Sequence, residues 1–329
     1  MEIVDPRSEG EWQDGGEGED VRRALEQLRE EVQTRLLGRR APVAGVGVGV
    51  DWENLFERAR RSLSALGMAE RSGEVDEFGM DEVVLRRAAR LFDFLMDRWW
   101  RIETTGLDAS APPAPALLVA NASGLLPYDA IMIAHAVARA QPSAPRPRFL
   151  VADWLITLPF VQANLARIGG VRACRENAER LLRSGRSVVS FPEGVKGSAK
   201  VFRERYRLKR FGRGGVVRMA LAAGVPLVPV AVIGAEETYP VLFRVTTLAR
   251  AAGLPFLPVT PTFPWLGPLG LIPLPSHWQL RFGAPVDLRP FGPEAAEDEL
   301  LVARLTEELR EQIQAMVREG VRARAAVFG

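Results

Sequence analysis

The sequence predicts an α/β fold in which a largely parallel central sheet is flanked by helices, with an N-terminal helical extension before it. The main observation is that, from about residue 112 onward, short apolar runs alternate with helical stretches. The expected strands are Leu117–Ala120, Phe149–Ala152, Ser187–Phe191, Leu227–Ile233 and Gln279–Phe282. The expected helices are Ile131–Arg139, Glu176–Arg183, Val216–Ala223 and Asp298–Arg318. Strands separated by helices are typical of parallel sheets, because parallel neighbours need a long crossover between them.

The first 110 residues differ from the rest in composition and in the spacing of their apolar residues. Residues 1–20 are acidic and rich in glycine, so we expect a disordered tail. Residues 21–37 place leucine and valine at helical spacing among charged side chains, which predicts an amphipathic helix, and a small-residue linker follows. Two more helices are expected, at 51–66 and 81–102. The predicted organisation is a tail at 1–20, a helical N-terminal region at 21–110 and an α/β domain at 111–329.

The composition excludes several classes of protein. With 47% hydrophobic and 26% charged residues over 329 positions, the chain is neither disordered nor collagen-like nor a multi-pass membrane protein. A single cysteine, Cys174, excludes an intrachain disulfide and a zinc site built on several thiolates. Only two histidines are present, so we expect no metal site, and a net charge of +2 is too small to predict nucleic-acid binding. The N-terminus has no secretory pattern, so a cytoplasmic location is expected.

Two segments at expected strand ends carry polar groups suited to chemistry. Residues 121–129 form a polar turn between a strand and a helix, with Asn121, Ser123 and Asp129 as candidates. Residues 190–198 leave a strand through Pro-Glu-Gly, where Glu193 could hold a hydroxyl or orient a cation and Lys196 supplies a positive charge. Loops at the carboxyl ends of strands are where α/β proteins place reactive groups. The alternative is that these residues only build turns and helix caps.

A basic run follows the second segment, and it leads into a glycine-rich helix start at Gly212–Gly215. Its members are Lys200, Arg203, Arg205, Arg207, Lys209, Arg210 and Arg213. Such a run is usually a solvated face, but amide groups at a helix start with arginine nearby also suit a phosphate. A nucleotide-binding loop at 194–198 is a weaker alternative, because the spacing of glycines before Lys196 is wrong for it.

The segment 251–280 contains no Asp, Glu, Lys or Arg but seven prolines. The prolines exclude a regular membrane-spanning helix. We expect its large apolar side chains to be partly buried and partly at a membrane surface. For the pair Trp99-Trp100, packing in the core is favoured over lipid contact.

Taken in this order, the segments resemble the glycerolipid acyltransferases, which include lysophosphatidic acid acyltransferases. The resemblance spans about residues 80–290 and is most specific at Phe191-Pro192-Glu193-Gly194. Asn121 to Asp129 resembles the family's first block, which begins Asn-His and ends in Asp. Arg175 is similar to an arginine of a middle block, and Val225–Val230 is similar to the last block.

The resemblance implies an acyltransferase of the 1-acylglycerol-3-phosphate type, acting in phospholipid biosynthesis. Such an enzyme moves an acyl group from acyl-CoA or acyl carrier protein to a lysophospholipid, needs no other cofactor or metal, and lies on the inner face of the cell membrane, in contact with its lipids. Asp129 would orient the family's histidine base, while Arg175, Glu193, Gly194, Lys196, Asn121 and Ser123 would hold substrate.

This chain departs from the pattern at the base itself, because position 122 is Ala122. Alanine accepts no proton, and loss of a general base costs about 10²–10⁴-fold in rate. His135 and His277 are not expected to substitute for it. The sequence therefore leaves two alternatives open: an acyltransferase impaired at position 122, or a non-catalytic lipid-binding or scaffold relative.

Overall fold

The computed structural model describes residues 75–107, 114–124, 126–156, 161–247, 249 and 254–324. The predicted tail at 1–20 and the predicted helices at 21–37 and 51–66 lie outside the described residues.

A seven-stranded sheet forms the centre of the described part of the chain, with the strand order β1-β9-β6-β2-β5-β3-β4. Neighbours from β6 to β4 pair in parallel, whereas β9 pairs antiparallel with β6 and parallel with β1. The strands are β1 (Glu103–Thr105), β2 (Leu117–Ala120), β3 (Arg148–Val151), β4 (Gly170–Arg172), β5 (Val188–Ser190), β6 (Leu227–Ile233) and β9 (Gln279–Phe282). The predicted α/β class with a largely parallel sheet is confirmed.

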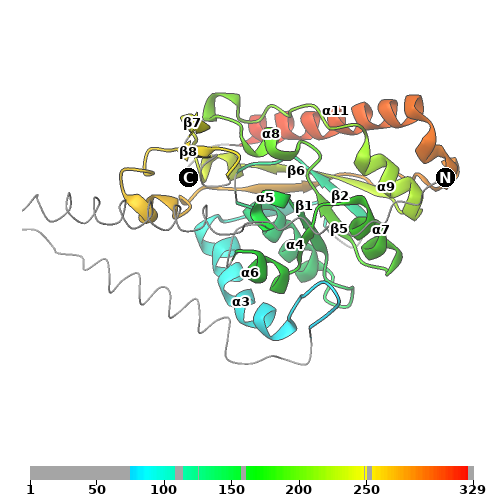
Figure 1. Cartoon of the computed structure of the whole chain (residues 1–329), viewed down its shortest axis with the longest axis horizontal. Helices are drawn as coiled ribbons and strands as arrows, with labels where there is room; N and C mark the ends of the chain where they lie inside the picture. Colours follow the sequence, from blue (N-terminus) through cyan, green and yellow to red (C-terminus); the bar gives the residue numbers. More distant parts are fainter. Residues whose placement is uncertain are drawn as a thin grey trace, which may run out of the picture. The chain divides into compact units, whose positions relative to one another are not determined.

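Helices cover both faces of this sheet (Figure 1). One face carries α3 (Glu82–Phe94), α4 (Tyr128–Ala140), α5 (Asp153–Ile156) and α6 (Val161–Arg167). The other carries α7 (Arg175–Arg183), α9 (Gly215–Ala223) and the long α11 (Glu299–Ala323). The result is a three-layered α/β/α arrangement.

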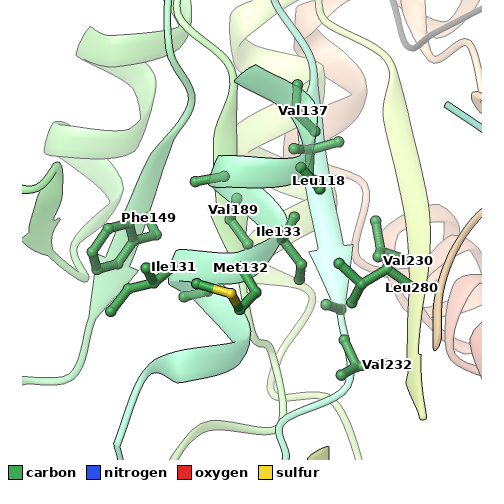
Figure 2. Packing of buried hydrophobic residues seen from close by; sticks show 14 of the residues in the cluster. Leu118, Ile131, Met132, Ile133, Val137, Phe149, Val189, Val230, Val232 and Leu280 are labelled. Carbon is green, nitrogen blue, oxygen red and sulfur yellow. The ribbon is translucent and has the colours of Figure 1, made fainter. Parts of the chain in front are cut away.

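The two cores follow from the alternation of side chains along each strand. In β2, Leu118 and Ala120 belong to one core, while Leu117 and Val119 belong to the other. All four are buried, because both faces of the sheet are covered. Figure 2 shows the first core, in which Met132 and Ile133 of α4 lie against the strands.

Residues 75–107 contribute a helix and an edge strand to this fold. Helix α3 continues into a five-residue π-helix (Leu95–Trp99), and the following Trp100 is fully buried and stacked on Trp278, with ring centroids 4.4 Å apart. Strand β1 then joins the sheet edge. The core packing favoured for the tryptophan pair is confirmed for Trp100.

The apolar segment after residue 253 is partly buried and partly exposed. Phe256 and Trp278 are buried, whereas Trp265 is 77% exposed, and Leu266, Leu269 and Ile272 are exposed as well. The segment contains β8 (Leu257–Val259), which pairs with β7 (Phe243–Val245), and a 3-10 helix at Gly267–Leu271. In the portion of the chain that the structure describes, no helix is long and apolar enough to cross a membrane.

Candidate active site

A pocket of about 130 Å³ lies at the carboxyl ends of four neighbouring parallel strands, β2, β5, β3 and β4. This edge is where open α/β sheets bind ligands, since the loops that leave the strands converge there. Its described lining residues are Ala122, Gly124, Pro127, Asp129, Leu150, Val151, Ala152, Trp154, Leu155, Ala173, Ser190, Phe191, Gly194 and Ser198. The two segments selected from the sequence therefore meet at one pocket, which we call the reaction pocket.

Asn121 fixes the start of the turn by extending the sheet with its side chain. Strand β2 ends at Ala120, and the carboxamide of Asn121 then accepts the Val232 amide (2.8 Å) and donates to the Val232 carbonyl (2.9 Å). The side chain is completely buried. These bonds hold the next residue, Ala122, at the pocket, and the contact of Asn121 with substrate stays a prediction.

Asp129 lies in the first turn of α4 and lines the reaction pocket. Its Oδ2 accepts the amide of Ser123 (3.0 Å) and the hydroxyl of Ser123 (2.7 Å), and its Oδ1 accepts the Ala130 amide (2.8 Å). Burial raises the pKa of Asp129, although these hydrogen bonds oppose the rise. Ser123 thus contacts the aspartate that the sequence singled out.

Glu193 is buried behind the turn, and its side chain has 0% exposure. Its Oε1 accepts the amide of Ala122 at 2.8 Å, and its Oε2 accepts the amide of Lys209 at 2.6 Å. Both oxygens of this carboxylate are thus engaged by backbone amides, and its contact with a substrate, which the family resemblance implied, stays a prediction. The alternative role of orienting a cation fits the structure, because Lys200 Nζ lies 3.6 Å from Oε2.

The chain continues from Glu193 into a short helix, α8 (Gly194–Ser198), rather than an open loop. Gly194 lines the reaction pocket, but Lys196 is exposed and is not among the described lining residues. Gly197 packs against the turn so closely that a Cβ there would lie 2.4 Å from the Cβ of Glu193 and 3.0 Å from that of Ala122. Only glycine fits at this contact.

Arg175 borders a second pocket, of about 310 Å³, which we call the arginine pocket. Arg213 and Arg218 also line it, and its described lining includes no carboxylate. The two pockets share Leu150, Ala173 and Ser190, so they are contiguous. Arg175 also pairs with Glu179 at 2.6 Å, which raises the pKa of the guanidinium through the hydrogen bond.

Neither histidine is among the described lining residues of the reaction pocket. His135 is buried under α3, with Nε2 2.9 Å from Asp93 and Nδ1 3.2 Å from Arg146. His277 lies 3.1 Å from Glu103 at the sheet edge. Among the described residues, no group of three His, Cys, Asp or Glu side chains could hold a metal ion.

Lys200 was not predicted from the sequence to be a site residue. It was grouped with the basic run, whose other members are mostly exposed, whereas its own side chain is only 3% exposed. No local pattern distinguishes Lys200 from its neighbours, because its buried partner Glu236 lies 36 positions later, in the 3-10 helix that follows β6.

Comparison with known proteins gives both a family and close relatives. A family model described as Acyltransferase matches residues 101–233. An uncharacterized protein of Mycobacterium tuberculosis is 42% identical over 255 residues, covering 77% of this chain and 71% of that protein. An uncharacterized protein of Mycobacterium leprae is 41% identical over 255 residues, covering 77% of this chain and 70% of that protein.

The chain belongs to the acyltransferase family, which confirms the resemblance inferred from its motifs. The crystal structure of the 1-acyl-sn-glycerophosphate (LPA) acyltransferase from Thermotoga maritima is similar to it with a TM-score of 0.48 and 18% sequence identity. That match covers 82% of this chain and 90% of the other.

Proposed function

We propose that this chain is a glycerolipid acyltransferase of the 1-acylglycerol-3-phosphate type whose turnover is limited by Ala122. It would take an acyl group from acyl-CoA or acyl carrier protein and transfer it to a lysophospholipid. The observation that carries the proposal is the position of Ala122, which lines one pocket together with Asp129 and Gly194. A side chain longer than alanine at 122 would enter the space beside the aspartate.

The reaction needs a proton acceptor at this place. The acceptor's hydroxyl oxygen attacks the thioester carbonyl carbon, the C–S bond breaks, and the sulfur leaves as a thiol after the hydroxyl proton has passed to a base. Asp129 already accepts three hydrogen bonds from the turn and α4. It is therefore suited to orienting a base and is itself a poor one.

The arginine pocket suits the phosphate of the acceptor. Arg175, Arg213 and Arg218 supply guanidinium groups, which bind phosphate through paired hydrogen bonds. Because this pocket is contiguous with the reaction pocket, a lysophospholipid phosphate in one would leave the glycerol hydroxyl near the other. Lys196, exposed on α8, would then contact only the outer part of the acceptor.

A second candidate function is non-catalytic lipid binding, and Ala122 itself favours it. Such a relative would bind lysophospholipid or acyl thioester in the same pockets without turnover. Vesicle binding without any release of thiol by the chain as it stands would support this candidate.

Replacing Ala122→His tests the proposal. We expect thiol release from acyl-CoA in the presence of lysophosphatidic acid to rise by about 10²–10⁴-fold, because the imidazole supplies the missing base beside Asp129. Free imidazole added to the unchanged chain should restore a smaller part of this rate. The measurement is continuous thiol detection, with product formation followed by mass spectrometry.

Two controls define the outcome. The double variant Ala122→His with Asp129→Asn should lose most of the gain, because the imidazole then lacks the carboxylate that orients it. If Ala122→His shows no gain while the protein remains folded, the role of position 122 is wrong and lipid binding without catalysis is the better function.

A membrane surface is the further partner that we propose, at the inner face of the cell membrane. Exposed apolar side chains of α3 and of the segment 265–272 form what we call the apolar patch: Leu91, Phe94, Trp265, Leu266, Leu269 and Ile272. Trp99 joins its two parts, since its ring lies 6.2 Å from Phe94 and its indole donates to the Pro273 carbonyl. Exposed Arg90 and Arg98 lie on the same helical segment, exposed Arg101 follows it, and all three suit anionic lipid.

A further inference from the structure

A buried ionic cluster lies directly behind the reaction turn. Lys200 Nζ is 2.5 Å from Glu236 and 3.6 Å from Glu193. The side chains of these three residues are 0–5% exposed, so water screens their charges little. The cluster joins the segment after β5 to the 3-10 helix Ala235–Glu237 that follows β6.

Glu193 connects this cluster to the backbone of the site. One carboxylate oxygen accepts the amide of Ala122, and the other accepts the amide of Lys209. The orientation of a single carboxylate therefore fixes two segments, the turn at 122 and the loop that leads towards the arginine pocket. Any change in that orientation changes both.

The charges show why a cation is needed here. Two buried carboxylates face one ammonium group, and a buried carboxylate without a partner costs several kcal/mol or becomes protonated. Burial alone lowers the pKa of Lys200, but Glu236 and Glu193 raise it and the net direction is upward. Burial raises the pKa of Glu236, while Lys200 opposes the rise. Lys200 thus stays charged and favours the ionised form of the carboxylates beside it.

We propose that Lys200 is a positioning residue of the reaction site: by holding the Glu193 carboxylate, it fixes the backbone at position 122 against the reaction pocket. This inference rests on the proposed function for its role in transfer, but the geometry it asserts can be measured without any turnover. Lys196, four residues earlier and exposed, makes no such contact in the described structure.

The test is amide hydrogen exchange on the full chain, comparing Lys200→Met with the matched control Lys196→Met. We expect the amides of Ala122 and Lys209 to exchange at least about tenfold faster in Lys200→Met, because Glu193 without its counter-ion becomes protonated or reorients and accepts both amides less strongly. Amides of β6, measured in the same samples, report any general loss of stability. In Lys196→Met both site amides should remain at the parental rate.

Two further variants test the proposal if Lys200→Met does not fold. Lys200→Arg keeps the charge and should restore most of the protection at Ala122. Glu193→Gln removes the ion pair and replaces one of the two acceptor oxygens by an NH2 donor, so at least one of the same two amides should be exposed. The proposal is overturned if the amides of Ala122 and Lys209 exchange at the parental rate in Glu193→Gln. It is also overturned if Lys200→Met accelerates amide exchange equally at these two residues and in β6.

Transfer activity in the Ala122→His background gives a readout that a merely structural role would not change. Lys200→Met should lower kcat and move the pH profile to higher pH, because loss of the ammonium raises the pKa of the nearby imidazole. Lys200→Arg should restore the parental profile. If Ala122→His transfers nothing at all, the proposed function fails, and the exchange experiment alone decides the role of Lys200.

Discussion

Asp129 combines burial with three hydrogen bonds, so its protonation should affect stability in a characteristic direction. Burial raises its folded pKa above the unfolded value of about 3.9. The contribution to stability is then fully present below the unfolded pKa and is lost as the pH rises through the folded pKa. The difference in the free energy of unfolding, parent minus Asp129→Asn, should therefore fall as the pH rises above the unfolded pKa of the aspartate. Urea unfolding at a series of pH values measures it.

Asp153 provides a control with the opposite sign. Its hydrogen bond from Arg172 lowers the pKa of this exposed carboxyl. The contribution of Asp153 is present above the unfolded pKa and is lost as the pH falls through the folded pKa. The parent-minus-variant difference for Asp153→Asn should therefore rise with pH. The same slope in both series would contradict the assignment for Asp129.

At the residue scale, the sequence predicted which segments form the site better than what each side chain does there. Ala122 and Asp129 share a pocket, because both lie in one strand-to-helix turn. Asn121 and Glu193 were expected to touch substrate, yet both bind backbone amides. The partner of Asn121 lies 111 positions away in the chain and that of Glu193 lies 71 positions away, so no local pattern could have revealed them.

At the scale of single elements, the join between β2 and its turn depends on Asn121. Replacing Asn121→Ala leaves the buried amide and carbonyl of Val232 without their partner. We expect the free energy of unfolding to fall by about 2–4 kcal/mol, from two unsatisfied buried groups. Urea unfolding at neutral pH measures the change. As a control, Asn177→Ala removes an exposed bond to the Arg172 carbonyl and should change stability by less than about 0.5 kcal/mol.

The elements that the sequence predicted are those with a strong apolar pattern. Strands β2, β6 and β9 have the predicted bounds, and each carries at least two buried hydrophobic residues, consecutive in β2 and β6 and alternating in β9. Strand β4 was missed because only three residues pair and one of them is glycine. Strand β1 was missed because all its side chains are exposed and polar, so only its pairing with β9 makes it a strand.

For the whole molecule, the arrangement of layers explains why the two pockets are neighbours. The chain leaves β2 into α4 on one face and leaves β4 into α7 on the other. The reaction pocket lies at the start of α4, and the arginine pocket lies at the starts of α7 and α9. The two pockets meet at strand ends that line both of them. A substrate could therefore span this edge of the sheet, with its anionic group in the arginine pocket and its reacting group in the reaction pocket.

The apolar patch predicts how the whole protein meets a membrane. We expect the chain to pellet with vesicles that contain anionic lipid and to dissociate as salt rises, because arginines beside the patch contribute attraction that ions screen. Phe94→Ser combined with Trp265→Ser should lower the bound fraction at low salt by at least about fivefold, since both exposed rings are lost.

The control for this experiment is Leu300→Ser, which removes an apolar side chain that is even more exposed than Phe94 and Trp265 but lies at the start of α11, outside the patch. It should leave the bound fraction unchanged, because bilayer contact depends on the patch and not on total exposed apolar surface. Vesicles of neutral lipid alone should bind the parent less than anionic ones. If the parent protein remains in the supernatant with anionic vesicles at low salt, the membrane is not its partner. If Leu300→Ser lowers the bound fraction as much as the double variant does, the apolar patch is not the contact surface.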